Sequence, residues 1–146
     1  LHDSFKEYAQ NIVSNAKALG EGLINNGIEV VSGGTDNHLL LLDLTKTGLS
    51  GKEGEVALDS VGIYTNKNMV PYDKRNPMDP SGLRIGTAAL TTRGFGEEEM
   101  RQIGEMIART VNNSTKQEML DGIRDRVEEM TMAHPLYEGW SYESPE

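Results

Sequence analysis

The sequence has no cysteine in its 146 residues, and it has only one tryptophan and two phenylalanines. Without cysteine there is no disulfide framework, no thiolate nucleophile and no thiolate metal site. The lack of cysteine fits a reducing cytoplasm, where we expect the protein to be located. The three histidines are scattered without metal-ligand spacing, so the sequence predicts no zinc site.

Positive charge is also scarce. Fourteen Lys and Arg stand against 23 Asp and Glu, which gives a formal net charge of −9 at pH 7. This excess of acid argues against a nucleic-acid partner or an anionic membrane surface. No apolar run has the length of a membrane-spanning helix, and the first residues lack the charged-then-apolar pattern of a signal peptide.

Length and periodicity predict one domain at 1–140, followed by a polar, frayed tail at 141–146. Apolar residues at three- and four-residue spacing predict amphipathic helices, which cover 5–23, 100–111 and 120–130. A shorter helix follows Ser50, because Ser50 and Glu53 have the spacing of a capping box. The first helix begins almost at residue 1, so we expect the chain to be part of a longer protein.

Short apolar runs bounded by turn residues predict strands at 28–31, 38–44, 63–65 and 83–87. The first two are joined by a short glycine-rich turn and should be antiparallel neighbours. The segment 66–82 contains three prolines and no periodicity, which is typical of a functional loop. The order of elements predicts an α+β domain with a small, mostly antiparallel sheet covered by helices on one face.

One arginine follows this loop in an unusual setting. Arg84 lies between Gly82 and Gly86 in the run Ser-Gly-Leu-Arg-Ile-Gly-Thr. The planar fork of donors on arginine matches a carboxylate with two hydrogen bonds, and flanking glycines let a ligand approach closely. The local pattern alone still favours an edge-strand arginine that faces water, because short Gly/Arg patterns recur by chance.

Several ordered segments change this balance. They are Val-Val-Ser-Gly-Gly-Thr-Asp-Asn-His-Leu at 30–39, Asn-Lys-Asn at 66–68, the arginine run at 81–87 and Thr-Thr-Arg-Gly-Phe at 91–95. Together with the helical opening, they resemble the C-terminal domain of serine hydroxymethyltransferase, a pyridoxal-phosphate enzyme of fold type I. This family interconverts serine and glycine with one-carbon transfer to tetrahydrofolate. The resemblance extends from about residue 5 to residue 137.

The resemblance implies that Arg84 binds the α-carboxylate of serine or glycine, and with it we favour this role over a surface one. It also implies pyridoxal phosphate and tetrahydrofolate as cofactors of an intact homodimer or homotetramer. In the family the Schiff-base lysine follows a run of threonines and a histidine, a context that neither Lys46 nor Lys116 has. We therefore expect an N-terminal pyridoxal-phosphate domain of the same polypeptide to supply it. The chain itself should have no catalytic residue and no activity alone.

The loop 66–82 matches the folate side of the family only in part. Asn68 matches the second Asn of Asn-Lys-Asn, and it either hydrogen-bonds the pterin or caps a turn through its own backbone. The family's Ser-Pro-Phe element is replaced here by Asn76-Pro77-Met78, and its Val-Thr by Asp79-Pro80. Methionine fills an apolar slot but does not stack as a phenyl ring does. These departures leave open whether the carrier is folate or a modified pterin.

Three other motifs could carry chemistry or could serve the fold. Asp36 suits a turn and His38 opens a strand, so we do not assign them an acid–base role. Gly33-Gly34 leads into a strand and not into a helix N-terminus, which favours a turn over a phosphate cradle. Arg93 either pairs with an acid or contacts a neighbouring subunit, and the sequence does not separate these two roles.

Two other functions stay open. A free-standing binding or oligomerisation module would keep the fold and would also lack the Schiff-base lysine. Another enzyme of fold type I, such as an aminotransferase, would also hold a substrate carboxylate with a C-terminal arginine. The Asn-Lys-Asn motif favours serine hydroxymethyltransferase over the aminotransferase, whereas the altered residues at 76 and 78–80 keep the aminotransferase open as an alternative.

Overall fold

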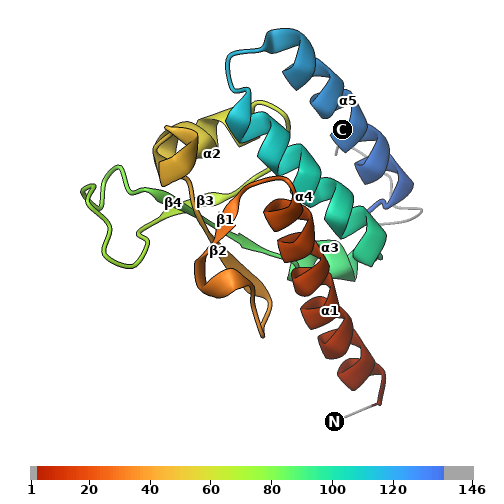
Figure 1. The fold of residues 1–146 in the computed structure, drawn as a ribbon. Helices are drawn as coiled ribbons and strands as arrows, with labels where there is room; N and C mark the ends of the chain where they lie inside the picture. Colours follow the sequence, from red (N-terminus) through yellow and green to blue (C-terminus); the bar gives the residue numbers. More distant parts are fainter. Residues whose placement is uncertain (1–2, 137–146) are drawn as a thin grey trace, which may run out of the picture.

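Five α-helices and a four-stranded antiparallel sheet make up the residues that the computed structural model describes, 3–136 (Figure 1). The predicted α+β class is confirmed. The helices are α1 (Asp3–Asn25), α2 (Gly51–Asp59), α3 (Ala88–Thr92), α4 (Glu97–Asn112) and α5 (Gln117–Ala133). The strands are β1 (Glu29–Val30), β2 (Leu39–Asp43), β3 (Asn66–Asn68) and β4 (Gly82–Gly86), and short 3₁₀ turns lie at η1 (Val31–Gly33) and η2 (Thr45–Thr47).

The sheet has the strand order β1-β2-β4-β3, so β4 lies between β2 and β3. Because side chains alternate along a strand, each strand directs one set of residues to each face. Leu40, Leu42, Leu83 and Ile85 are buried in the core that the helices form on one face. The opposite face carries half-buried leucines and an exposed arginine, and the helices leave it uncovered in the described chain.

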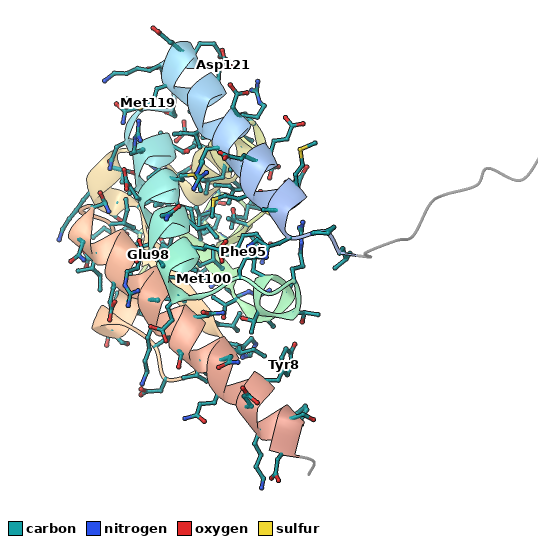
Figure 2. The ribbon with its side chains drawn as sticks, turned by 90° about the vertical axis from the view of Figure 1, so that its right-hand side faces the viewer. Tyr8, Phe95, Glu98, Met100, Met119 and Asp121 are labelled. Carbon is teal, nitrogen blue, oxygen red and sulfur yellow. The ribbon has the colours of Figure 1, made fainter. Side chains whose placement is uncertain are left out.

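The helices α1 and α4 pack closely, and α5 lies beside α4 (Figure 2). Two glycines allow the close approach of α1 and α4. A Cβ atom on Gly22 would lie 2.5 Å from the carbonyl oxygen of Arg101, and one on Gly104 would lie 2.8 Å from the backbone nitrogen of Leu23. The two helix backbones therefore meet where neither helix has a side chain, and larger residues there would push them apart.

The capping box at the start of α2 is confirmed. The backbone N–H of Ser50 donates to Glu53 Oε2 (2.7 Å), and the backbone N–H of Glu53 donates to Ser50 Oγ (3.2 Å). The turn between β1 and β2 is also confirmed, since Ser32 and Gly33 have φ angles of 65° and 70°. Both features depend on residues close in sequence, which explains why the sequence predicts them.

The predicted strand at 63–65 is wrong. These residues have no regular structure, and the strand β3 begins at Asn66, inside the predicted loop. Ile63 packs against the core as a partly buried side chain, which accounts for its apolar character. The sequence also misses the short helix α3, and the predicted tail at 141–146 lies outside the described residues. Within residues 3–136, no helix is both long and apolar enough to cross a bilayer.

Candidate functional site

Arg84 lies in the middle of β4, on the face of the sheet that the helices leave uncovered. Leu83 and Ile85, on either side of it in sequence, are buried, whereas Arg84 itself is exposed. The register places Leu41 of β2 on one side of Arg84 and Asn66 of β3 on the other. Its position is thus set by backbone pairing on both sides of the strand.

The guanidinium group of Arg84 has no partner within residues 3–136. Each of the other six arginines forms an ion pair with a carboxylate or donates to a carbonyl oxygen in the same part of the chain; they are Arg75, Arg93, Arg101, Arg109, Arg124 and Arg126. An exposed arginine in a central strand, with its five donors free, is available to a ligand.

An open hollow lies beside β2, one of the two strands that pair with β4. It has a volume of about 700 Å³ and lies between α1, the turn after β1 and the uncovered face of β2. Leu41, the cross-strand neighbour of Arg84, lines it, as do Leu39, Lys17 and Glu21. Its volume is in the range of small-molecule sites, although it opens widely to solvent.

The structure brings Asn68 to the same face as Arg84. Asn68 is opposite Gly82 in the register, and Gly82 is two residues before Arg84 on β4, so the side chains of Asn68 and Arg84 point to one side of the sheet. The Asn68 amide donates to the carbonyl of Met69 (2.8 Å), while its Oδ1 has no partner within residues 3–136. The NH₂ group of Asn68 therefore stabilises the start of the loop, and its Oδ1 is free to accept a hydrogen bond within the described chain.

The other candidates, Asn76, Pro77 and Met78, lie at the exposed end of the loop. Asn76 Oδ1 accepts hydrogen bonds from the backbone N–H groups of Met78 (2.8 Å) and Asp79 (3.1 Å), and Met78 is 77% exposed. Figure 1 shows this loop projecting from the end of the sheet that is far from α3. The hydrogen bonds of these residues within the described chain stay inside the loop.

Sequence reasoning missed Asp73. Its carboxylate accepts four hydrogen bonds, one each from the Val70 and Arg75 backbone N–H groups and two from Ser81. Burial would raise the pKa of Asp73, but the hydrogen bonds from Ser81, Arg75 and Val70 outweigh burial and hold the pKa well below its ordinary value. An aspartate inside a proline-rich segment without periodicity was the only signal in the sequence.

Arg93 serves the fold. Its Nε donates to the carbonyl of His134 (2.8 Å), and its Nη2 donates to the carbonyl of Thr131 (2.8 Å). These carbonyls belong to the end of α5, where a cation is favourable. Within the described residues Arg93 therefore pairs with carbonyl oxygens and not with a carboxylate.

The loop residues Asp36 and His38 are both exposed, and no hydrogen bond joins their side chains within the described chain. Asn37 organises this turn, because its Oδ1 accepts from the Thr35 hydroxyl (3.2 Å) and from the Leu39 backbone N–H (2.8 Å). Within residues 3–136, Asp36 and His38 are therefore not hydrogen-bonded to each other as an acid–base pair.

The lysines of this chain lie mostly at the surface. Six of the seven are exposed, and Lys67, the remaining one, is half-buried on the edge strand β3. A Schiff-base lysine must lie in a site that also cradles the cofactor phosphate. Lys17 lines the open hollow beside β2 that is described above. Between residues 3 and 136, no group of three His, Asp or Glu side chains is arranged to hold a metal ion.

Comparison with known protein families gives a match to most of the chain. A family model described as serine hydroxymethyltransferase matches residues 1–107, which is well over half of the chain. The matched range includes Arg84, Asn68 and the whole loop between β3 and β4, and it ends within α4. The family is a transferase lineage whose members generally depend on pyridoxal phosphate. The chain therefore belongs to the serine hydroxymethyltransferase family.

Proposed function

We propose that this chain is the C-terminal part of a longer serine hydroxymethyltransferase, in which Arg84 binds the α-carboxylate of serine or glycine. The observation that carries the proposal is the free guanidinium of Arg84 on an otherwise uncovered sheet face. A carboxylate held by two parallel hydrogen bonds is fixed in orientation as well as in position. Holding the carboxylate in this way would determine which bond to the substrate Cα is oriented for cleavage.

The rest of the active site would come from outside this chain. Bound pyridoxal phosphate supplies an electron sink for carbanion chemistry, and we expect the lysine that attaches it to lie outside this chain. An N-terminal domain of the same polypeptide, in a homodimer or homotetramer, would hold it. Arg84 would then act as a substrate-binding residue, and this chain would contain no catalytic residue.

The loop between β3 and β4 would form part of the folate side. Asn68 Oδ1, which has no partner among the described residues, is free to accept a hydrogen bond from a pterin N–H group. Asn76, Pro77 and Met78 would contact a more exposed part of the one-carbon carrier. Tetrahydrofolate is the expected carrier, and a modified pterin is the alternative.

A non-catalytic binding or oligomerisation module is the second candidate. Such a module would also lack a Schiff-base lysine, so the absence of that lysine would not separate the two functions. The mass of the native polypeptide that carries this sequence separates the two. We expect a product long enough to include a pyridoxal-phosphate domain. For the intact polypeptide, accumulation of pyridoxamine phosphate with common amino acids would indicate an aminotransferase instead.

Substitution of Arg84 tests the carboxylate assignment. In the intact polypeptide, Arg84→Ala and Arg84→Lys should raise the KM for serine by about 100-fold and about tenfold, because lysine keeps the charge and loses the bidentate fork. Cofactor absorbance should stay unchanged. Arg109→Lys, which alters a surface i,i+4 pair with Glu105, is the matched control. Normal serine kinetics in both Arg84 variants would refute the assignment.

A further inference from the structure

One carboxylate joins the two ends of the loop that precedes β4. Asp73 Oδ2 accepts from the backbone N–H groups of Val70 (3.2 Å) and Ser81 (2.8 Å). Asp73 Oδ1 accepts from the Ser81 hydroxyl (2.7 Å) and from the backbone N–H of Arg75 (2.9 Å). Val70 lies just after β3 and Ser81 just before β4, so the side chain connects the two strands through the loop.

The ends of this loop are buried, whereas its middle is exposed. Val70 is 8% exposed and Ser81 is 5% exposed, but residues 74–78 are all exposed. Hydrogen bonds to a charged acceptor are shorter and stronger than neutral ones. The anchoring of the loop is thus concentrated where the chain enters β4.

Ser81 connects Asp73 to the body of the domain. Its carbonyl accepts from the backbone N–H of Leu44 (3.0 Å), and the carbonyl of the preceding Pro80 accepts from the backbone N–H of Gly51 (2.6 Å). The first residue of β4 therefore follows a segment that is bonded to the end of β2, to the start of α2 and to Asp73.

At the start of β4, the backbone of Gly82 is closely packed against its neighbours. A Cβ atom on Gly82 would lie 2.6 Å from Val70 Cγ1 and 2.7 Å from the carbonyl oxygen of Leu42. Arg84 is two residues further along this strand. A displacement of Val70 or Ser81 would therefore move the backbone that presents Arg84.

We propose that Asp73 is a positioning residue for Arg84. By joining Val70 to Ser81 it sets the position of the arginine on the uncovered face, and it does so without contact with the substrate. The inference rests on the proposed function of Arg84. It adds an acidic loop residue whose role is to hold the carboxylate-binding arginine in register.

Asp73→Asn is the direct test, with Asp59→Asn as its control. Asparagine carries an NH₂ group where aspartate has an acceptor, so at least one backbone N–H of the loop loses its partner. Asp59 is exposed, and its carboxylate has no partner within residues 3–136. In the intact polypeptide, Asp73→Asn should raise the KM for serine about tenfold with kcat changed less than about twofold, and Asp59→Asn should change neither.

A double-mutant cycle separates positioning from general loss of structure. If Asp73 acts through Arg84, the effect of Asp73→Asn on KM should fall below about twofold in the Arg84→Lys background. An equal effect in both backgrounds would overturn the positioning role. A normal KM in both Arg84→Lys and Arg84→Ala would instead overturn the proposed function, so the two failures are distinguishable.

Amide hydrogen exchange gives a readout that does not depend on activity. The amides of Val70 and Ser81 should lose at least about tenfold of their protection in Asp73→Asn, while those of α1 and α4 stay unchanged. If Asp73→Asn does not fold, Ser81→Ala provides the test. It removes one of the four hydrogen bonds to the Asp73 carboxylate and keeps the charge of that carboxylate. It should raise KM about two- to threefold, and an unchanged KM would refute the inference.

Discussion

At the scale of single residues, the partners of a charged group indicate its role. The Nε and Nη2 atoms of Arg93 both donate to carbonyl oxygens at the end of α5. Its guanidinium carbon lies 5.8 Å from the centre of the Phe95 ring. Arg84 has no partner in the described chain and faces the open side of the sheet. The two arginines, close in sequence, therefore differ in role: one is structural and the other is available for a ligand.

Glu99 shows how such contacts affect stability. Burial would raise the pKa of Glu99, but hydrogen bonds from the Gly96 backbone N–H (2.9 Å) and from His134 (2.5 Å) hold it below its ordinary value. A carboxyl whose pKa is lowered by folding stabilises the protein above its unfolded pKa. That stability is lost as the pH falls through the folded pKa.

We therefore expect Glu99→Gln to lower the free energy of unfolding by about 1 kcal/mol at pH 7 and to have less effect at pH 3. Urea unfolding between pH 3 and pH 7 measures both values. Glu98→Gln is the control, because Glu98 is exposed and its nearest partner, Arg101, is 3.7 Å away. A loss for Glu99→Gln that is equal at both pH values would contradict this account.

At the scale of elements, the packing of α1 on α4 depends on space that only glycine leaves. A Cβ atom on Gly104 would lie 2.8–2.9 Å from backbone atoms of Leu19, Gly22 and Leu23 in α1. A Cβ atom on Gly122, in α5, would have no described atom within 4 Å. Both glycines lie inside helices, and they differ in what faces them.

Gly104→Ala should therefore lower the free energy of unfolding by about 2–3 kcal/mol, because a methyl group there separates two packed helices. Gly122→Ala should raise it by about 0.5–1 kcal/mol, since alanine favours helix and nothing in the described chain obstructs it. Urea unfolding of the two variants gives the comparison. Equal effects on stability would show that the two helices do not pack as described.

At the scale of the whole molecule, the sheet has one face in the core and one face without helices. The uncovered face presents Arg84 beside the half-buried Leu39 and Leu41, and the hollow next to these leucines is open. We propose that the pyridoxal-phosphate domain of the intact polypeptide closes this site. The chain alone would then hold one wall of the site and none of its cofactor.

Borohydride reduction in the presence of pyridoxal phosphate tests this division. On this chain alone we expect only sparse labelling spread over the exposed lysines, because we expect the Schiff-base lysine to lie outside this sequence. In the intact polypeptide, one lysine outside this sequence should be labelled stoichiometrically, as peptide mass spectrometry would show. Stoichiometric labelling of a single lysine between residues 1 and 146 would contradict the proposal.

Features that depend on neighbouring residues could be predicted from the sequence. The capping box of Ser50 and Glu53 and the long amphipathic helices are local, because their partners lie within one turn or one repeat. The ordered motifs around Arg84 also indicate the family, since several specific segments in the right order rarely coincide by chance.

Features that depend on distant residues emerge only when the chain is folded. The strand β3 begins at Asn66 because β4 pairs with it there, and its polar sequence is that of an edge strand. Asp73 becomes an anchor because folding brings Val70 and Ser81 around it. Arg84 is free because no acidic side chain within residues 3–136 pairs with it. The spacing of residues along the chain does not predict this. Long-range pairing and packing create these relations, and neither is encoded in any single segment.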